Sequence, residues 1–264
     1  MTALMTDLFS LKGRTALITG GSRGIGRMIA KGFLAQGATV YISARKAQAC
    51  IDTAKELSQY GTCIALPADV SSVAGAQGLA AAYMALEPQL DILVNNAGAA
   101  WGEDYDTFPE SGWDKVVNLN MKAPFFLTQI LTPALRQAAK TQVAKVINIA
   151  SIDGVSINAQ ETYSYAASKA GLIHLTKRMA LRLAKDNIAV SAIAPGAFAS
   201  EMNKVARDHG DMVSKRVPAG RVGVDEDMAG AAIYLASRAG DYVVGATLVV
   251  DGGVSFTRQS DDAP

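Results

Sequence analysis

The turn that decides the fold lies near the amino end, where residues 14–26 read RTALITGGSRGIG. The apolar run RTALIT is typical of a buried strand, and a pattern of helical period follows the last glycine. Glycines let such a turn tighten, and the free N–H groups at a helix N-terminus bind phosphate. The spacing Gly20-x3-Gly24-x-Gly26 differs from the usual G-x-G-x-x-G, and glycines alone can mark a mere tight turn. The position after the first strand favours a dinucleotide site, formed by Gly20, Ser22, Arg23, Gly24, Ile25 and Gly26.

Outward from this turn, short apolar runs alternate with stretches of helical period. The expected strands are 14–19, 39–44, 62–67, 91–94, 145–150, 188–194 and 247–250, and the expected helices are 26–36, 47–60, 74–86, 116–139, 165–185 and 225–237. The runs are continuously apolar, as in strands that helices cover on both faces. The sequence therefore predicts an α/β fold, a single doubly wound Rossmann-type domain whose parallel sheet has about seven strands.

No linker or internal repeat divides residues 1–264, so we interpret them as one domain with loose ends at 1–10 and 257–264. Residues 197–217 interrupt the rhythm beyond the end of a strand, which is where ligands bind in such sheets. We expect them to form a mobile segment that covers the substrate. An ordinary pair of surface helices is the alternative.

Composition narrows the classes of partner. The 264 residues include 50% hydrophobic ones and carry a formal net charge of +1, which favours a large core and argues against nucleic acid. Cys50 and Cys63 lack the spacing of metal or redox pairs and are interpreted as free thiols, and with 2 histidines we expect no protein-held catalytic metal. No signal peptide and no apolar run of about 18 residues is present, so we expect a soluble, cytoplasmic protein without a membrane span.

The second expected strand indicates which dinucleotide binds. An acid about 20 residues past the glycines would bind the ribose hydroxyl of NAD, but residues 27–51 contain no Asp or Glu. Arg45 and Lys46 stand there instead, and a guanidinium binds a 2′-phosphate in a fixed fork. We therefore expect NADP(H) in preference to NAD(H). The alternative is that Arg45 is only a solvated loop charge.

Other cofactor contacts are expected where the third and fourth strands end. Asp69, followed by Val70, could accept a hydrogen bond from the adenine amino group, although Asp69 or Ser71 could equally cap a helix. Asn96, Ala97 and Gly98 follow the fourth strand, where small residues let the backbone approach a ligand. A simple turn is the alternative there.

The stretch Tyr165-Ala-Ala-Ser-Lys169 carries the candidate chemistry. At spacing i,i+4 its two functional side chains share one helix face. The ordinary pKa of a phenol, about 10, is high for proton transfer at neutral pH, and a neighbouring ammonium is expected to lower it. Ser151 ends the fifth expected strand and could bind a carbonyl oxygen beside the phenol. A serine nucleophile is disfavoured because no nucleophile elbow surrounds Ser151.

Together these motifs resemble the short-chain dehydrogenase/reductase family over nearly the whole chain, from Gly13 to Gly253. Within the family the chain is similar to the β-ketoacyl reductase branch, including rhamnolipid-type reductases. The matching motifs follow the family's order: Thr19-Gly20-x3-Gly24-x-Gly26, Asn95-Asn96-Ala97-Gly98, Ser151, Tyr165-x3-Lys169, Pro195-Gly196 and Asp251-Gly252-Gly253.

The resemblance implies a role for each matching residue. Tyr165 would be the acid–base catalyst, Lys169 would lower its pKa and hold the nicotinamide ribose, and Ser151 would steady the carbonyl. Asn120, seven residues after Trp113, would hold a water in the proton relay, with Asn118 as a neighbouring alternative. Further cofactor contacts are implied for Ile147, Pro195 and Gly196. Residues 197–202 lack the family's usual Thr, so backbone groups would replace its contact to the carboxamide.

The activity that the resemblance implies is reduction of a hydrophobic ketone or β-ketoacyl substrate by NADPH. The candidate substrate contacts, each of which could equally be core, are Trp101, Ile152, Phe198 and Met202. One alternative is an NAD(P)-dependent alcohol, polyol or steroid dehydrogenase on the same fold. Another, of a different class, is a non-catalytic dinucleotide-binding regulator. The family also implies a homotetramer that assembles through helices 116–139 and 165–185.

Overall fold

The computed structural model describes residues 5–201 and 203–257. Its centre is a 7-stranded sheet in the order β3-β2-β1-β4-β5-β6-β7, and every neighbouring pair is parallel. The predicted Rossmann-type α/β fold is confirmed, and no expected strand end is displaced by more than two residues. The strands are β1 (Thr15–Thr19), β2 (Thr39–Ser43), β3 (Cys63–Ala65), β4 (Ile92–Asn95), β5 (Ala144–Ile149), β6 (Ile188–Pro195) and β7 (Thr247–Val250).

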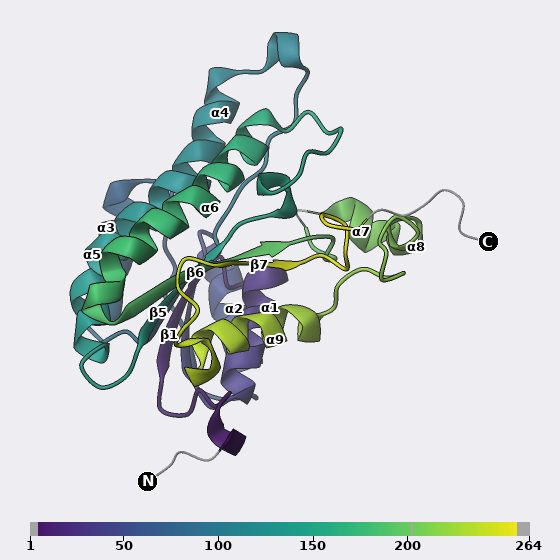
Figure 1. Ribbon diagram of the computed structural model, residues 1–264. Helices are drawn as coiled ribbons and strands as arrows, with labels where there is room; N and C mark the ends of the chain where they lie inside the picture. The colour runs from purple at the N-terminus through teal and green to yellow at the C-terminus, as the bar shows by residue number, and fades with distance from the viewer. Residues whose placement is uncertain (1–4, 202, 258–264) are drawn as a thin grey trace.

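Helices cover both faces of the sheet, so the molecule has three layers (Figure 1). The helices α1 (Gly24–Ala35), α2 (Ala47–Leu57) and α9 (Asp225–Ala236) share one core with the sheet. On the opposite face, α3 (Val73–Met84), α5 (Ala123–Ala138) and α6 (Tyr163–Leu183) share the other. This double cover explains why the strands are apolar on both faces. Of the helices in the described residues, none is both long enough and apolar enough to cross a membrane.

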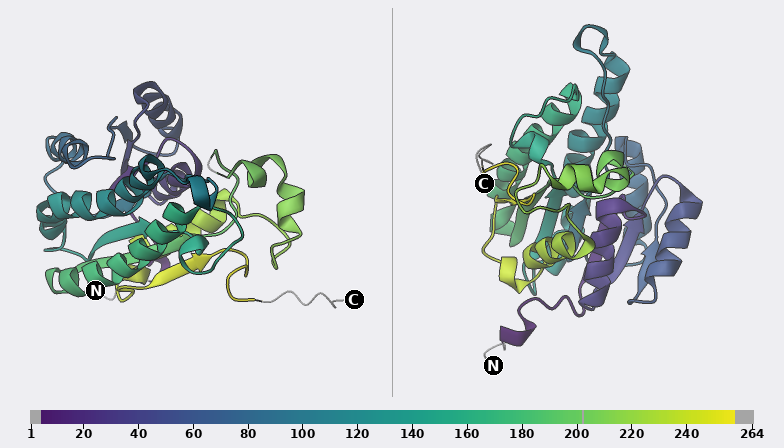
Figure 2. Two further views of the ribbon diagram at one scale, coloured as in Figure 1. Left: turned by 90° about the horizontal axis from the view of Figure 1, so that it is seen from above. Right: turned by 90° about the vertical axis from the view of Figure 1, so that its right-hand side faces the viewer.

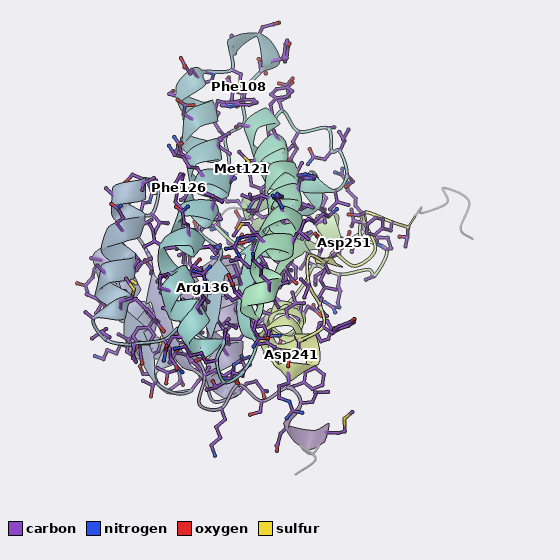
Figure 3. All side chains as sticks on the ribbon, turned by 60° about the vertical axis from the view of Figure 1, so that its left-hand side comes forward. Phe108, Met121, Phe126, Arg136, Asp241 and Asp251 are labelled. Atoms are coloured by element: carbon purple, nitrogen blue, oxygen red, sulfur yellow. The ribbon has the colours of Figure 1, made fainter. Side chains whose placement is uncertain are left out.

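Parallel pairing brings the carboxyl ends of all seven strands to one edge of the sheet. The chain order reverses between β1 and β4, and ligands bind beyond the strand ends at such a switch point. Asp251 directly follows β7 at this edge, whereas Asp241 lies towards the opposite one (Figure 3). The edge with Asp251 therefore carries the candidate site.

The expected helix over 116–139 is three elements rather than one. It consists of α4 (Glu110–Val117), a π-helical turn over Asn118–Lys122 and then α5. Pro124 stands in the first turn of α5 and has no N–H for the carbonyl of Asn120, four residues earlier. The wider turn accommodates this missing bond, and π-turns occur frequently at functional sites. The start of α4 and the short turn η2 (Tyr105–Thr107) project beyond the other helices (Figure 2).

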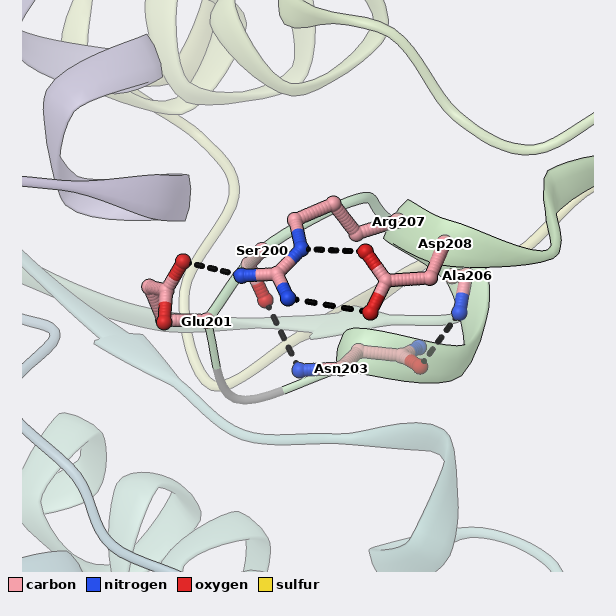
Figure 4. Close-up of polar contacts among 6 residues, drawn as sticks. All are labelled: Ser200, Glu201, Asn203, Ala206, Arg207 and Asp208. Carbon is pink, nitrogen blue, oxygen red and sulfur yellow. Dashed lines mark hydrogen bonds and ion pairs between the residues drawn. The ribbon is translucent and has the colours of Figure 1, made fainter.

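The segment predicted to cover the substrate contains two short helices, α7 (Lys204–Asp208) and α8 (Gly210–Ser214). Arg207 forms ion pairs with Glu201 and with Asp208, and Asn203 caps α7 by accepting from the Ala206 N–H at 3.0 Å (Figure 4). These contacts are internal to the segment. The secondary structure of residues 197–217 thus agrees with the alternative of a pair of surface helices. That this segment moves to cover a substrate stays a prediction.

The predicted loose ends lie partly outside the described residues, which begin at Met5 and end at Thr257. Inside that range, Met5–Asp7 form the short turn η1. Cys50 is buried and Cys63 half-buried, and both are free thiols. Burial raises the pKa of Cys63 to about 12, which keeps this thiol protonated at neutral pH.

Candidate active site

The glycine turn is closed against the end of β4 by one side chain. The Asn96 amide nitrogen donates to the carbonyls of Thr19, at 2.8 Å, and Gly20, at 3.1 Å. A Cβ on Gly26 would come within 2.4 Å of that nitrogen, so this position requires glycine. Gly20 and Gly24 have φ of +66° and +52°, values that favour glycine. Helix α1 begins at Gly24, two residues earlier than expected, with its free N–H groups at the turn.

Two arginines lie at this turn, Arg23 within it and Arg45 beside it. The ends of β1 and β2 pair through Thr19 and Ser43, so Arg45 follows β2 next to the turn that contains Arg23. Both arginines are exposed, and within residues 5–201 and 203–257 neither guanidinium has a hydrogen bond or ion pair. The arrangement suits an anion with two or more charges near the end of β2.

Asp69 is exposed at the end of β3, and one of its carboxylate oxygens accepts from the Ser71 N–H at 3.0 Å. The cap of α3 is neither Asp69 nor Ser71 but Ser72, which accepts from the Gly75 N–H at 3.1 Å. The helix-cap alternative is therefore wrong for both residues. The contact of Asp69 with adenine stays a prediction, as does a contact of the buried Val70.

Asn120 holds the loop after β4 in place. Its Oδ1 accepts from the Ala99 N–H at 2.8 Å, and its Nδ2 donates to the Ala99 carbonyl at 2.9 Å and to the Ser168 hydroxyl at 3.0 Å. The side chain is thus committed to protein partners. The backbone carbonyl of Asn120 lacks its usual helical donor because Pro124 has no N–H, and the predicted contact of Asn120 with a water stays a prediction.

Ser151 and Tyr165 meet although they belong to different elements. Ser151 follows β5 and caps the short turn η4 (Ile152–Gly154), accepting from the Asp153 N–H at 3.2 Å. Tyr165 lies in the first turn of α6, and its phenol is close enough to the Ser151 side chain for Ser151 to lower the pKa of that phenol. The two hydroxyls therefore face one point at the carboxyl edge of the sheet.

Lys169 lies one helical turn after Tyr165 and is buried. Its Nζ donates to the Ile149 carbonyl at 2.7 Å and lies 5.6 Å from the centroid of the Tyr165 ring. A Cβ on Gly98 would be 3.7 Å from this nitrogen, so the loop after β4 passes directly beside it. The phenol, the ammonium and the Ser151 hydroxyl are thus gathered beside the loop that Asn120 holds.

The expected direction of the Tyr165 pKa is wrong for this structure. Burial raises the pKa of the phenol, the hydrogen bond with Ser151 opposes this rise, and the Asp153 carboxylate adds to it. Burial also lowers the pKa of Lys169, to about 8, and the Asp153 charge counteracts that shift. The sequence pattern places a cation next to the phenol, but desolvation is the larger effect on both groups.

The comparisons with known proteins agree with this geometry. Residues 14–211 match the model of the family described as short chain dehydrogenase. The chain belongs to the short-chain dehydrogenase family. It is accordingly an oxidoreductase that acts on CH–OH and C=O groups.

Individual members show which substrates and cofactors occur in this family. The chain is 49% identical to the rhamnolipids biosynthesis 3-oxoacyl-[acyl-carrier-protein] reductase of Pseudomonas aeruginosa, over 94% of this chain and 99% of that one. It is 40% identical to the 2-dehydro-3-deoxy-D-gluconate 5-dehydrogenase of Bacillus subtilis, over 94% and 96%. The solved Pseudomonas aeruginosa RhlG/NADP active-site complex has a TM-score of 0.91 and 48% identity, over 94% and 99% of the two chains.

The substrate contacts predicted for this short-chain dehydrogenase are only partly gathered at Tyr165. Ile152 directly follows Ser151 and is half-buried. Phe198 instead belongs to the core, where its ring fills the space in front of Gly223. Trp101 packs on α4, with the Lys115 ammonium 5.0 Å from its ring. Met202 lies outside the described residues.

Two features of the site escaped the sequence reasoning. The first is Asp153, the one charged group in the described part of the chain that shifts the pKa of both Tyr165 and Lys169. Its position two residues after Ser151 is a usable signal. The second is the π-turn, for which Pro124, four residues after Asn120, is the signal in the sequence.

Proposed function

We propose that this short-chain dehydrogenase is an NADPH-dependent reductase of ketones, of the hydrophobic or β-ketoacyl type. The observation that carries the proposal is the meeting of the buried Ser151 hydroxyl, the half-buried Tyr165 and the buried Lys169 ammonium. A proton donor, a carbonyl-binding hydroxyl and a cation are the groups that ketone reduction requires from the protein.

The residues around the glycine turn fit NADP(H). The N–H groups at the start of α1 would bind the pyrophosphate, and the exposed guanidinium groups of Arg23 and Arg45 would bind the 2′-phosphate. No acid stands between residues 27 and 51 to repel that phosphate. When bound, NADPH supplies the hydride for the carbonyl carbon. Solved relatives in complex with NADP support this choice.

The remaining steps belong to the side chains. Ser151 donates a hydrogen bond to the carbonyl oxygen and Tyr165 transfers its phenolic proton to the same oxygen as negative charge develops there. The raised pKa of Tyr165 keeps the phenol protonated, as a proton donor must be before reduction. Lys169 stabilises the phenolate that results, and a water on the Asn120 carbonyl would return the proton to it.

A second candidate is oxidation of a sugar acid on the same residues. It is favoured by relatives named as gluconate dehydrogenases, for example the 2-dehydro-3-deoxy-D-gluconate 5-dehydrogenase of Bacillus subtilis. A panel with both coenzymes separates the two candidates: a β-ketoacyl thioester and methyl acetoacetate test reduction, and gluconate tests oxidation. Faster turnover of gluconate than of the ketones would favour the second.

The substitution Tyr165→Phe tests the catalytic assignment. It removes one hydroxyl and should lower kcat for ketone-dependent NADPH consumption by about 100-fold or more, because general-acid groups contribute on that order. The control is Tyr242→Phe, since Tyr242 is fully exposed and its loss should change nothing. Unchanged kcat in Tyr165→Phe would contradict the assignment of Tyr165 as the proton donor, whereas a wild type that consumes no NADPH with any ketone would favour the non-catalytic regulator.

A further inference from the structure

Asp153 places a carboxylate at the rim of the catalytic residues. It lies in the turn η4, which Ser151 caps, and its side chain is half-buried. The Asn158 amide donates to its Oδ1 at 2.7 Å, and the Lys169 ammonium acts on it as an opposite charge. Both groups favour the ionised form of the carboxyl against its burial.

The turn that carries Asp153 is pressed against α6. A Cβ on Gly154 would come within 2.6 Å of the Lys169 carbonyl carbon and 2.7 Å of the Ala170 nitrogen. This close backbone packing places the turn, and with it Asp153, directly beside the part of α6 that carries Lys169. The Asp153 carboxylate, when ionised, therefore contributes to the electrostatics of the site and raises the pKa of both Tyr165 and Lys169.

The two charges at the site balance each other while Asp153 is ionised. Without its carboxylate, the buried Lys169 ammonium would be the single charge beside the reacting carbonyl, and it would attract an anion. When Asp153 is ionised, a substrate carboxylate that approaches the site is repelled by the Asp153 carboxylate. Solvent screens this repulsion only weakly, because Asp153 is half-buried. The relatives of this chain include enzymes named for gluconates, which are carboxylates, and for a 3-oxoacyl thioester.

We propose that Asp153 is a specificity-determining residue, which makes the site reject substrates with a carboxylate beside the reacting carbonyl and favour neutral β-keto esters and thioesters. This inference rests on the proposed ketone reduction and narrows its substrate class. It assigns Asp153 no part in proton transfer: the residue acts by its charge on the ligand.

The test uses acetoacetate and methyl acetoacetate, which share one ketone and differ in a single carboxylate. We expect the wild type to have the higher kcat/KM for the ester. In Asp153→Asn the ratio of kcat/KM for acetoacetate to that for the ester should rise about tenfold. This is the order of effect expected from removing one weakly screened like charge near the substrate. A change in the Tyr165 phenol affects both ketones equally and cancels in the ratio.

Two further variants control for the fold and for the general charge of the molecule. Asp153→Glu keeps the charge and should keep the preference for the ester. Asp104→Asn removes an exposed acid outside the site and should leave the ratio at its wild-type value. An equal ratio in the wild type and Asp153→Asn, or the same increase in Asp104→Asn, would overturn the inference.

Failure of the proposed function is a different result. If the wild type consumes no NADPH with either ketone, ketone reduction is wrong, and calorimetric titration of acetoacetate into the NADP⁺-loaded protein then decides the role of Asp153. About tenfold tighter binding of acetoacetate to Asp153→Asn than to the wild type supports the charge effect. Equal dissociation constants overturn it.

Discussion

Lys169 carries an ammonium in surroundings that favour the neutral amine. It is 4% exposed, and burial lowers its pKa to about 8. In the unfolded chain a lysine titrates at about 10.4. Between these values the unfolded chain binds more protons than the folded one, so the contribution of Lys169 to stability rises with pH across this window. Below pH 8 the folded state carries the whole penalty of the buried charge.

Substitution of this residue should therefore separate activity from stability. Lys169→Met should abolish ketone reduction yet remove a penalty on the order of 3 kcal/mol at neutral pH, since a buried cation gives way to an apolar chain. The lost hydrogen bond to Ile149 offsets about 1 kcal/mol of this gain. Denaturant unfolding of both proteins from pH 7 to pH 10 measures the difference, which should shrink as pH rises. A difference that does not vary with pH would contradict the lowered pKa of Lys169.

Among the elements, the turn η4 packs closely against its neighbour α6. Gly154 meets the backbone of α6, not the end of a flexible side chain, so an added Cβ can be accommodated only if the turn or the helix moves. Ser151 caps this turn and would move with it. Small displacements of positioned groups reduce rates strongly.

Gly154→Ala should consequently lower both activity and stability. We expect kcat to fall by about 100-fold through misplaced hydroxyl geometry and unfolding to become easier by about 1–3 kcal/mol through overpacking. The matched control is Gly78→Ala in α3, where an added Cβ meets nothing within 4 Å. That variant should unfold no more easily than the wild type, because alanine favours a helix over glycine. Equal kcat and equal free energies of unfolding in the two variants would show that close packing of η4 on α6 does not position the turn.

Over the whole molecule, charge is also buried at the edge of the sheet opposite the site. Lys145, at the start of β5, is 1% exposed and pairs at 2.8 Å with Asp241, which is 39% exposed. Arg14 and Asp91, both buried, add one charge of each sign. These two cations and two anions sum to zero net charge, and they lie next to β1 and β4, in β5 and in the segment before β7.

Asp241→Asn would leave the buried Lys145 ammonium without its anion. We expect a loss of about 2–3 kcal/mol of unfolding free energy, less than for a fully buried pair because Asp241 is partly solvated. The same substitution in a Lys145→Met background should cost almost nothing, which a double-mutant cycle by denaturant unfolding measures. The values of kcat and KM should not change, since the ion pair lies at the end of the strands opposite to Tyr165. Equal costs in both backgrounds would show that the ion pair contributes nothing.

Local pattern decided most of the architecture. Continuously apolar runs require a sheet covered on both faces, and the turn after β1 requires glycine, so the strands and the nucleotide-binding edge follow from residues close together in the chain. The pairing of Tyr165 with Lys169 is equally local, because helical spacing places them on one face. Pro124 is a local signal for the π-turn over Asn118–Lys122, which interrupts the helix expected over 116–139. The apolar periodicity across this range nevertheless predicts one continuous helix.

Packing between distant segments decided the rest. That Ser151 meets Tyr165 and that the Asp153 charge acts on both Tyr165 and Lys169 depend on how β5, η4 and α6 fit together. That Phe198 is core depends on its packing against Gly223. Burial is a property of the whole fold, and it sets the direction of both pKa shifts at the site. The sequence by itself therefore determined which groups are available for catalysis, whereas only the tertiary structure determined their surroundings, because desolvation and charge act through space and not along the chain.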